Sequence, residues 1–339
     1  MKKVVTMGEI MLRLSAPVYQ KLEQAHSFDV IYGGGEANVA ISLANFGLSS
    51  SFVSKLPTNA LGESAKQHLN RYNVSTDHMV YGDGRLGVYY LEKGFSLRSS
   101  KVIYDRHHSA FAQSKVDEYD LDAIFEGADW FHISGITPAL SEELFHLSKK
   151  ALKVAKEKGI TTSCDLNYRS SLWTFENARE KMTELIQYVD VCLGVEPLQL
   201  LDKNGTDIKD TYSKPLSVKD YQEIITEMHK QFDFKYMAMT FREHLSVNRN
   251  RLYALLSDGN KFYQSTEVEV EFVDRVGAGD AFSAGMIYSL ITGFQLQKVV
   301  DFATGCFALK HTIEGDANVL RTSDIEQFLA QRGALTINR

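Results

Sequence analysis

The feature that most constrains the fold of this chain is an alternation of short apolar runs with amphipathic stretches along most of its length. This alternation is typical of strand–helix–strand units around a parallel sheet. Residues 141–158 show the helical part most clearly, because apolar residues recur every three or four positions and Gly159 follows the last turn. The sequence therefore predicts an α/β fold. The expected main-sheet strands are Val4–Met7, Ser51–Lys55, Trp130–Ile133, Thr161–Asp165, Val189–Leu193 and Lys235–Thr240, with helices at 37–47, 62–72, 141–158, 176–187, 217–231, 277–291 and 296–311 and a strand pair at 251–256 and 261–265.

Two segments, 9–33 and 85–106, depart from this pattern, because polar and apolar residues alternate there without a helix between them. Such alternation is typical of antiparallel strands. We expect these segments to stand off the main sheet as a lid, since α/β folds bind ligands at the carboxyl ends of their parallel strands. Exposed apolar residues on lid strands also predict a homo-oligomer that packs through the lids. No proline- or glycine-rich linker marks a second domain, so residues 1–339 are expected to form a single domain.

Composition narrows the class of protein. The 339 residues are 44% hydrophobic and 24% charged, which is typical of a globular soluble protein. The net charge of −6 argues against nucleic acid or an anionic membrane as the main partner, and no apolar run approaches the ~20 residues that span a bilayer. Residues 1–10 lack the features of a signal peptide, and Cys164, Cys192 and Cys306 lack zinc-site spacing. We therefore expect a cytoplasmic protein with free thiols.

The strongest chemical signal is the run Val273–Phe282, which contains Gly277, Ala278, Gly279 and Asp280. Small residues let backbone N–H groups crowd around an anion, and the apolar run that follows is expected to be a helix whose positive end points at the same place. A carboxylate beside such an anion hole can accept a proton from an attacking hydroxyl while the N–H groups stabilise a transferring phosphoryl group. The alternative is an ordinary glycine turn in which the aspartate caps the helix.

A second glycine segment, Gly33–Ala40, places three glycines directly before a helix and Asn38 in its first turn. Backbone at Gly33 and Gly34 could approach a polyol closely, and the Asn38 amide could bind hydroxyl groups. A flexible loop is the alternative. The segment is not the dinucleotide fingerprint, which requires G-x-G-x-x-G directly after the first strand.

Together, Gly33–Ala40 and Asp274–Asp280 resemble the two signature regions of the ribokinase-like PfkB carbohydrate kinases, and the match in order and spacing covers essentially the whole chain. The resemblance implies a three-layer α/β/α fold with a mostly parallel central sheet and a small β-stranded lid. It implies ATP-dependent phosphorylation of a sugar hydroxyl, with Asp280 as catalytic base and the Gly277–Gly279 turn as anion hole. Mg²⁺ is expected, because transfer from ATP requires charge neutralisation, and the need for a monovalent cation stays open.

Further segments resemble the 2-keto-3-deoxygluconate kinases of this family. Asp165–Trp173 is similar to their D-x-N-x-R-x-x-L-W stretch, whose arginine reaches the substrate. Val102–Arg106 is similar to their Y-x-R on a lid-side strand, and Lys310–Asp316 to their K-H-x-x-x-G-D segment. The resemblance, with the glycine segment, implies a substrate site at Gly33, Gly34, Asn38, Tyr89, Tyr104, Arg106, Arg169 and Asp316.

The two arginines fit a sugar acid, because guanidinium groups bind carboxylates with directional, charge-assisted hydrogen bonds. The alternative is that Arg169 pairs with Asp165 and that Arg106 is solvated, which would favour a neutral sugar such as fructose or ribose. A sugar-binding regulator without turnover is a third possibility, although it would not need Asp280.

The chain departs from the family's pattern at three places. Arg275 replaces a common threonine, and we expect no ligand contact from it. The N-x-x-E element that organises the water around magnesium lacks its asparagine, which leaves Glu196 as an uncertain metal residue acting through water. Thr240–His244 lacks the glycines of T-x-G-x-x-G, so Arg242 either contacts phosphate or pairs with a neighbour such as Glu243. The expected nucleotide site comprises Thr240, Arg242, Gly277, Gly279 and Ala303.

Overall fold

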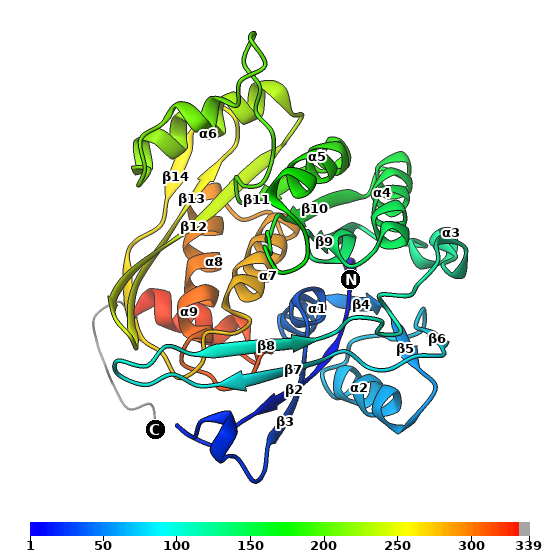
Figure 1. Cartoon of the computed structure of the whole chain (residues 1–339). Helices are drawn as coiled ribbons and strands as arrows, with labels where there is room; N and C mark the ends of the chain where they lie inside the picture. The colour runs from blue at the N-terminus through cyan, green and yellow to red at the C-terminus, as the bar shows by residue number, and fades with distance from the viewer. Residues whose placement is uncertain (332–339) are drawn as a thin grey trace.

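A computed structural model describes residues 1–331. Its centre is a nine-stranded sheet between two layers of helices (Figure 1), which confirms the expected three-layer α/β/α fold. Six neighbouring strands are parallel, and three at one edge are antiparallel. In spatial order the strands are β14 (Phe262–Gln264), β13 (Arg249–Ser257), β12 (Tyr236–Ser246), β11 (Val191–Leu193), β10 (Thr161–Asp165), β9 (Trp130–Ser134), β1 (Lys3–Met7) and β4 (Ser49–Val53), and β15 (Val268–Glu271) also pairs with β13.

Two apolar cores lie on opposite faces of this sheet. One is covered by α3 (Leu121–Ile124), α4 (Glu142–Glu157), α5 (Phe175–Leu185) and α6 (Val218–Gln231), and the other by α1 (Gly35–Asn45), α7 (Ala278–Ile291), α8 (Leu296–Lys310) and α9 (Thr322–Ala330). A third core lies under α2 (Ala60–Arg71) and the two-stranded pair β5 (Lys55–Pro57) and β6 (Val80–Gly82). Short 3-10 turns occur at Leu22–Gln24, Val116–Glu118, Thr137–Ala139, Ile186–Tyr188 and Ile208–Thr211.

Helix α4 shows how the sequence determines an element. The hydroxyl of Ser141 accepts a hydrogen bond from the Leu144 amide at 3.3 Å and so caps the first turn. Leu144, Leu147 and Ala151 recur at helical spacing and are buried against the sheet, while the polar face is exposed. The helix ends before Gly159, whose φ of +72° a glycine adopts without strain.

A separate four-stranded sheet, called the small sheet below, is formed by β2 (Met11–Ser15), β3 (Asp29–Gly33), β7 (Val88–Glu92) and β8 (Lys101–Asp105) in the order β3-β2-β7-β8. It stands off the central sheet, as expected, and its β7–β8 hairpin extends toward the β12–β13 hairpin (Figure 1). The prediction of antiparallel strands is wrong for one pair, because β2 and β7 are parallel. Alternation along a strand determines which residues share a face but not the direction of a neighbouring strand.

The expected strands and helices are present with small differences at their ends, except for β12. This strand was expected to end at Thr240 and continues to Ser246. The segment Thr240–His244 has no glycine to turn the chain, so it stays extended and pairs with β13. The sequence analysis missed α3, α9, β5, β6 and β15, which are short or lie at the edges.

Candidate active site

The two glycine segments meet where the amino-terminal ends of α1 and α7 approach each other. The Asn38 side-chain amide donates to Asp280 Oδ2 at 2.7 Å, and Asn38 Oδ1 accepts from the Gly34 amide at 3.5 Å. The start of α1 is held against the sheet by the buried carboxylate of Glu36, whose Oε1 accepts from the Ser134 amide at the end of β9 at 2.9 Å. Residues more than two hundred positions apart therefore form one site at the carboxyl ends of the parallel strands.

The turn before α7 requires glycine at its first position. Gly277 has φ of +77°, and a Cβ atom there would lie 1.9 Å from the carbonyl oxygen of Asp316. No side chain caps α7, and within residues 1–331 the amides of Gly279 and Asp280 have no hydrogen-bond acceptor. Unpaired N–H groups at the positive end of a helix can bind an anion.

Asp280 lies beside these amides in an environment that disfavours its charge. Burial raises the pKa of Asp280 to about 7, and the negative charges of Asp165, Glu36 and Asp316 add to this effect against the hydrogen bond from Asn38. Burial likewise raises the pKa of Asp165 to about 6, although the charge of Arg169 opposes the shift. A carboxyl group with a pKa near neutrality can both accept and release a proton at physiological pH.

Asp280 opens into a cavity of about 480 Å³ between the small sheet and the amino-terminal ends of α1 and α7, called the Asp280 cavity below. Of the residues expected to bind substrate, the structure brings all but Gly33 to its wall. Gly33 lies behind the wall, where a Cβ atom would be 2.1 Å from Asp316 Oδ2. The expected residues that line the cavity are Gly34, Asn38, Tyr89, Tyr104, Arg106, Arg169 and Asp316.

The two arginines expected to bind substrate, Arg106 and Arg169, differ in their surroundings. Arg106 is buried, and its Nε donates to Glu9 Oε2 at 2.8 Å, so it is not the solvated residue of the alternative interpretation. The Arg169 side chain is exposed and forms no ion pair or hydrogen bond within residues 1–331, although its charge acts on the Asp165 carboxyl group. Of these two guanidinium groups, that of Arg106 is held by a carboxylate and that of Arg169 is not.

Tyr89 lies on the inner face of the small sheet, where its hydroxyl donates to Asp316 Oδ2. Its ring centroid is 5.7 Å from that of Tyr104, and the guanidinium of Arg106 lies 5.8 Å from the Tyr104 ring centroid. Tyr90 points to the opposite face, as expected from alternation along a strand.

Several residues of the Asp280 cavity were not predicted from the sequence. Arg275 was expected to make no ligand contact, yet it lines the cavity together with Arg242 and His244. Alternate residues of β12 point the same way, so Thr240, Arg242 and His244 share one face, while Glu243 faces the other side and pairs with Arg251 at 2.8 Å. Since alternate residues of a strand share a face, this arrangement was predictable once residues 236–246 were taken as one continuous strand. Gly35, Ile136 and Asn167 also line the cavity and were missed.

Arg242 and Arg275 form no ion pair within the described part of the chain. The Arg242 guanidinium lies 5.5 Å from the ring centroid of Phe307, and burial followed by the nearby charge of Arg275 lowers its pKa. Two guanidinium groups without carboxylate partners, close to the unpaired amides of α7, provide a strongly positive region.

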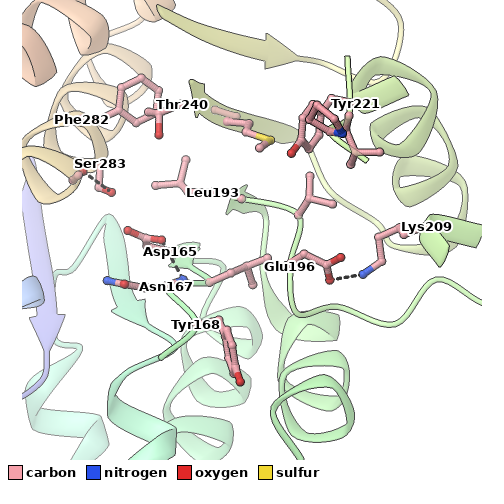
Figure 2. Close-up of a pocket in the computed structure, with 18 of the residues that line it drawn as sticks. Asp165, Asn167, Tyr168, Leu193, Glu196, Lys209, Tyr221, Thr240, Phe282 and Ser283 are labelled. Atoms are coloured by element: carbon pink, nitrogen blue, oxygen red, sulfur yellow. Dashed lines mark hydrogen bonds and ion pairs between the residues drawn. The ribbon is translucent and has the colours of Figure 1, made fainter. Parts of the chain in front are cut away.

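A second cavity of about 580 Å³, called the Thr240 cavity below, lies over the carboxyl ends of β10 and β11 and the middle of β12 (Figure 2). Leu193, Val195 and Phe282 supply apolar walls, and Thr240 and Ser283 supply hydroxyl groups. The two cavities meet, because they share Asp165, Asn167 and Gly279.

Carboxylates that could serve a magnesium ion line the same cavity. Figure 2 shows Asp165 on one side and Glu196 on the other, where Glu196 contacts the Lys209 ammonium group. Within residues 1–331, no three His, Cys, Asp or Glu side chains gather into a protein-only metal site. Mg²⁺ commonly uses one or two carboxylates together with substrate phosphates and water, so this donor set fits it without such a cluster.

Ala303 lies away from both cavities, which contradicts the expected nucleotide contact. It has 0% exposed surface and packs in the core between α7 and α8. Small residues on a helix are as well suited to close helix packing as to ligand contact, and the sequence pattern did not distinguish the two roles.

Replacing Asp280 by Asn is expected to stabilise the folded protein at pH 8 and to have less effect near pH 5. The folded-state pKa of about 7 exceeds the ordinary value of 3.8, so the folded state holds the proton more tightly and its stability falls as pH rises between these values. Asn carries no such penalty. Calorimetric melting temperatures at both pH values test this, with exposed Asp233→Asn as control. A stabilisation that does not change with pH would contradict the raised pKa.

Comparisons with known proteins show which family this chain resembles. The family "pfkB family carbohydrate kinase" matches residues 1–210 and 240–322. The 2-dehydro-3-deoxygalactonokinase of Haloferax volcanii is 34% identical over 329 residues, which cover 96% of each chain. The crystal structure of 2-dehydro-3-deoxygluconokinase from Thermotoga maritima is 44% identical, with a TM-score of 0.90 over 97% of this chain and 98% of that one.

A putative ribokinase II from E. coli, solved with ATP and Mg²⁺, has the same fold, with a TM-score of 0.81 at 20% identity over 98% of this chain and all of that one. None of the helices within residues 1–331 combines the length and apolar character needed to cross a bilayer. The family match includes both glycine segments that form the site, and close relatives match along almost the whole chain, so this protein belongs to the PfkB family of carbohydrate kinases.

Proposed function

We propose that this kinase transfers the γ-phosphoryl group of ATP to 2-keto-3-deoxygluconate and forms the 6-phosphate. The observation that carries this proposal is the presence of Arg106 and Arg169 in the same cavity as Asp280. A sugar acid places a carboxylate at one end and a primary hydroxyl at the other. Binding the carboxylate between the arginines would direct the hydroxyl toward Asp280.

Asp280 acts as the general base in this proposal. It accepts the proton of the 6-hydroxyl as that oxygen attacks the γ-phosphorus, the bond from the γ-phosphorus to the bridging oxygen breaks, and ADP leaves. The amides of Gly279 and Asp280 stabilise the charge on the transferring group. Asn38 orients the carboxylate through its 2.7 Å hydrogen bond, and Asp280 later releases the proton to solvent.

ATP is proposed to occupy the Thr240 cavity, with its γ-phosphate at Gly279, where the two cavities meet. Apolar walls and a volume of about 580 Å³ suit a nucleotide. Arg242 and Arg275 lie on the other side of Gly279, where their positive charges would attract the terminal phosphates. Asp165 and Glu196 would hold Mg²⁺ through water, and the ion supplies neutralisation of phosphate charge when it is bound.

Recognition of a sugar acid is supported by Arg169, whose exposed side chain forms no ion pair or hydrogen bond within residues 1–331. Nη1 of Arg106 also has no hydrogen-bond acceptor within residues 1–331, whereas Nε and Nη2 of the same guanidinium are held by Glu9. The names of the two closely matching relatives, a 2-dehydro-3-deoxygalactonokinase and a 2-dehydro-3-deoxygluconokinase, support the same class of substrate. The small sheet would act as a lid that excludes water from the reacting phosphoryl group.

A kinase of a neutral sugar is the second candidate. Glu9 compensates the charge of Arg106, which weakens that arginine as a carboxylate ligand. A probable fructokinase-6 from Arabidopsis thaliana is 26% identical over 89% of this chain, the same identity as that of the 2-dehydro-3-deoxygluconokinase of Thermoproteus tenax. A regulator without turnover would not need a base beside an anion hole.

The first test is Asp280→Asn in the purified protein. We expect kcat to fall by about 10²-fold or more, because the variant cannot accept a proton. In the wild type, kcat should decline as pH falls below about 7, since protonation removes the base. Steady-state kinetics from pH 5.5 to 8.5, with Asp233→Asn as control, measure both effects. Unchanged turnover in the Asn variant would contradict the mechanism.

The second test concerns the substrate. ATP consumption is measured with Mg²⁺ and with 2-keto-3-deoxygluconate, its galactonate epimer, fructose, ribose and gluconate. We expect a keto-deoxy acid to give the highest kcat/KM, and Arg169→Ala to lower that value about 10- to 100-fold by removing a charged hydrogen bond. Arg71→Ala, an exposed arginine on α2, is the matched control. Preference for fructose or ribose would reject the sugar-acid assignment while keeping the kinase.

The outer face of the small sheet is proposed to form a homo-oligomer interface. The paired residues Val30, Leu14, Tyr90 and Ile103 form an apolar row across all four strands. Val30 on the edge strand β3 is 59% exposed, and Ile103 on the edge strand β8 is 52% exposed. Apolar side chains on exposed edge strands favour pairing with another copy.

A charge within this row should separate the copies. We expect Ile103→Glu to reduce the mass in solution to that of one chain, because a carboxylate would be buried without a partner at the interface. Light scattering over a range of concentrations measures the mass. Leu97→Glu is the matched control, since Leu97 is 96% exposed at the tip of the same hairpin. A wild-type monomer would reject the proposed interface.

A further inference from the structure

Arg13, on β2 of the small sheet, is a fully buried arginine that the proposed mechanism does not use. Its Nη1 donates to Asp316 Oδ1 at 2.6 Å, and its Nη2 donates to Asp274 Oδ2 at 2.6 Å. Its Nε donates to Ser15 Oγ at 2.7 Å. Every face of the guanidinium is therefore occupied by protein, and the side chain cannot reach a substrate.

One partner of Arg13 holds the anion-hole turn. Asp274 Oδ1 accepts from the Val276 amide at 3.0 Å, directly before Gly277. Its Oδ2 also accepts from the Gly315 amide at 3.2 Å, next to Asp316. The Asp274 carboxylate thus links the turn that begins α7 to the loop after α8.

The other partner faces the sugar side. The Asp316 carboxylate lines the Asp280 cavity and accepts a hydrogen bond from the Tyr89 hydroxyl on β7. Its backbone carbonyl lies against Gly277, where no side chain would fit. One guanidinium therefore joins a carboxylate in the sugar site, a carboxylate behind the anion hole, and a strand of the small sheet.

The charges of this cluster balance only when Arg13 is present. Asp274 and Asp316 contribute two negative charges, and Arg13 and the fully buried Lys310 contribute two positive charges. A buried carboxylate without a compensating charge is strongly unfavourable. Removal of Arg13 would leave Lys310 facing both carboxylates, so Asp316 or Asp274 would have to move or take up a proton.

We propose that Arg13 is a positioning residue that couples the small sheet, the sugar-contacting Asp316 and the anion-hole turn, so that sugar binding and phosphoryl stabilisation depend on one buried guanidinium. The inference rests on the proposed function for the role of the sugar. A merely structural arginine would stabilise the fold equally whether or not substrate is bound. A coupling arginine transmits a change in the position of Asp316 to Asp274 and the anion-hole turn, and the reverse.

The arrangement also affects Asp280. The groups whose charges act on Asp280 are Asp165 at the end of β10, Glu36 on α1, Asp316 after α8 and Lys310 on α8. Arg13 offsets the negative charge of Asp316, so its loss should make Asp280 harder to ionise. The acid limb of the kcat profile should then move to higher pH.

The principal experiment is a double-mutant cycle that leaves Arg13 in place. Asp274→Asn alters the anion-hole side, and Tyr89→Phe alters the small-sheet side, and no hydrogen bond joins these two residues. We expect their effects on kcat/KM for the sugar to be non-additive by at least about threefold, since coupled sites fail additivity. Additive effects in two folded, active variants would overturn the proposal.

Hydrogen exchange provides a readout that does not require the correct sugar. In the protein without substrate, Tyr89→Phe should speed exchange of the hydrogen-bonded amides of Val276 and Ala281 and leave those of β9 unchanged. Unchanged exchange at Val276 and Ala281 would overturn the coupling. If none of the tested sugar acids is phosphorylated but the exchange effect is present, only the proposed function is rejected. The failure of the proposed function and the failure of the coupling can therefore be distinguished.

Two substitutions of Arg13 complete the test. We expect Arg13→Lys to lower kcat by about 10²-fold, because one ammonium group cannot hold both carboxylates in place, and to leave the pH profile unchanged. Arg13→Gln should additionally move the acid limb to higher pH. Loss of stability without any change in the kcat or pH profile of the folded fraction would assign a structural role and reject the proposal. If either variant does not fold, the cycle and the exchange measurement decide.

Discussion

The site depends on the close approach of two helix amino-terminal ends at one edge of the central sheet. The Asn38–Asp280 hydrogen bond marks the meeting point of α1 and α7, and the buried Glu36 carboxylate keeps α1 in place against β9. This arrangement concentrates backbone donors and a carboxylate at the wall of the Asp280 cavity. The raised pKa of Asp280 follows from that location, because burial and neighbouring carboxylates both disfavour its charge.

The sequence predicted the layers of the fold well, because the spacing of apolar residues and the glycines that end helices are local features. Residues 141–158 and Thr161–Asp165 were recognisable from spacing alone. The direction of β7 relative to β2 was not, since it depends on how distant segments enter the small sheet. The end of β12 was also missed: the strand was expected to end at Thr240, whereas it continues to Ser246 through a segment without glycine.

For the site, the sequence identified the segments but not all of their contacts. The glycine runs and the arginines Arg106 and Arg169 were singled out, and the structure brings them to one cavity. The partner of Arg106 could not be predicted, because Glu9 lies 97 residues away. Arg275 was set aside on the basis of the family pattern, and Ala303 was assigned to the nucleotide although it is a packing residue. Contacts between distant residues depend on the tertiary fold, which no local pattern specifies.

The division of the Asp280 cavity between two structural units has an evolutionary consequence. Asp280 and its amides belong to α7, which is anchored in the core of the molecule, whereas Tyr89, Tyr104 and Arg106 come from the small sheet or directly follow it. Substitutions on the small sheet can therefore reshape the wall proposed to face the sugar while the groups proposed to act in phosphoryl transfer stay in place on α7. Under the proposed function, substrate specificity in such a lineage can change through a few residues of the small sheet, while the proposed catalytic residues are retained.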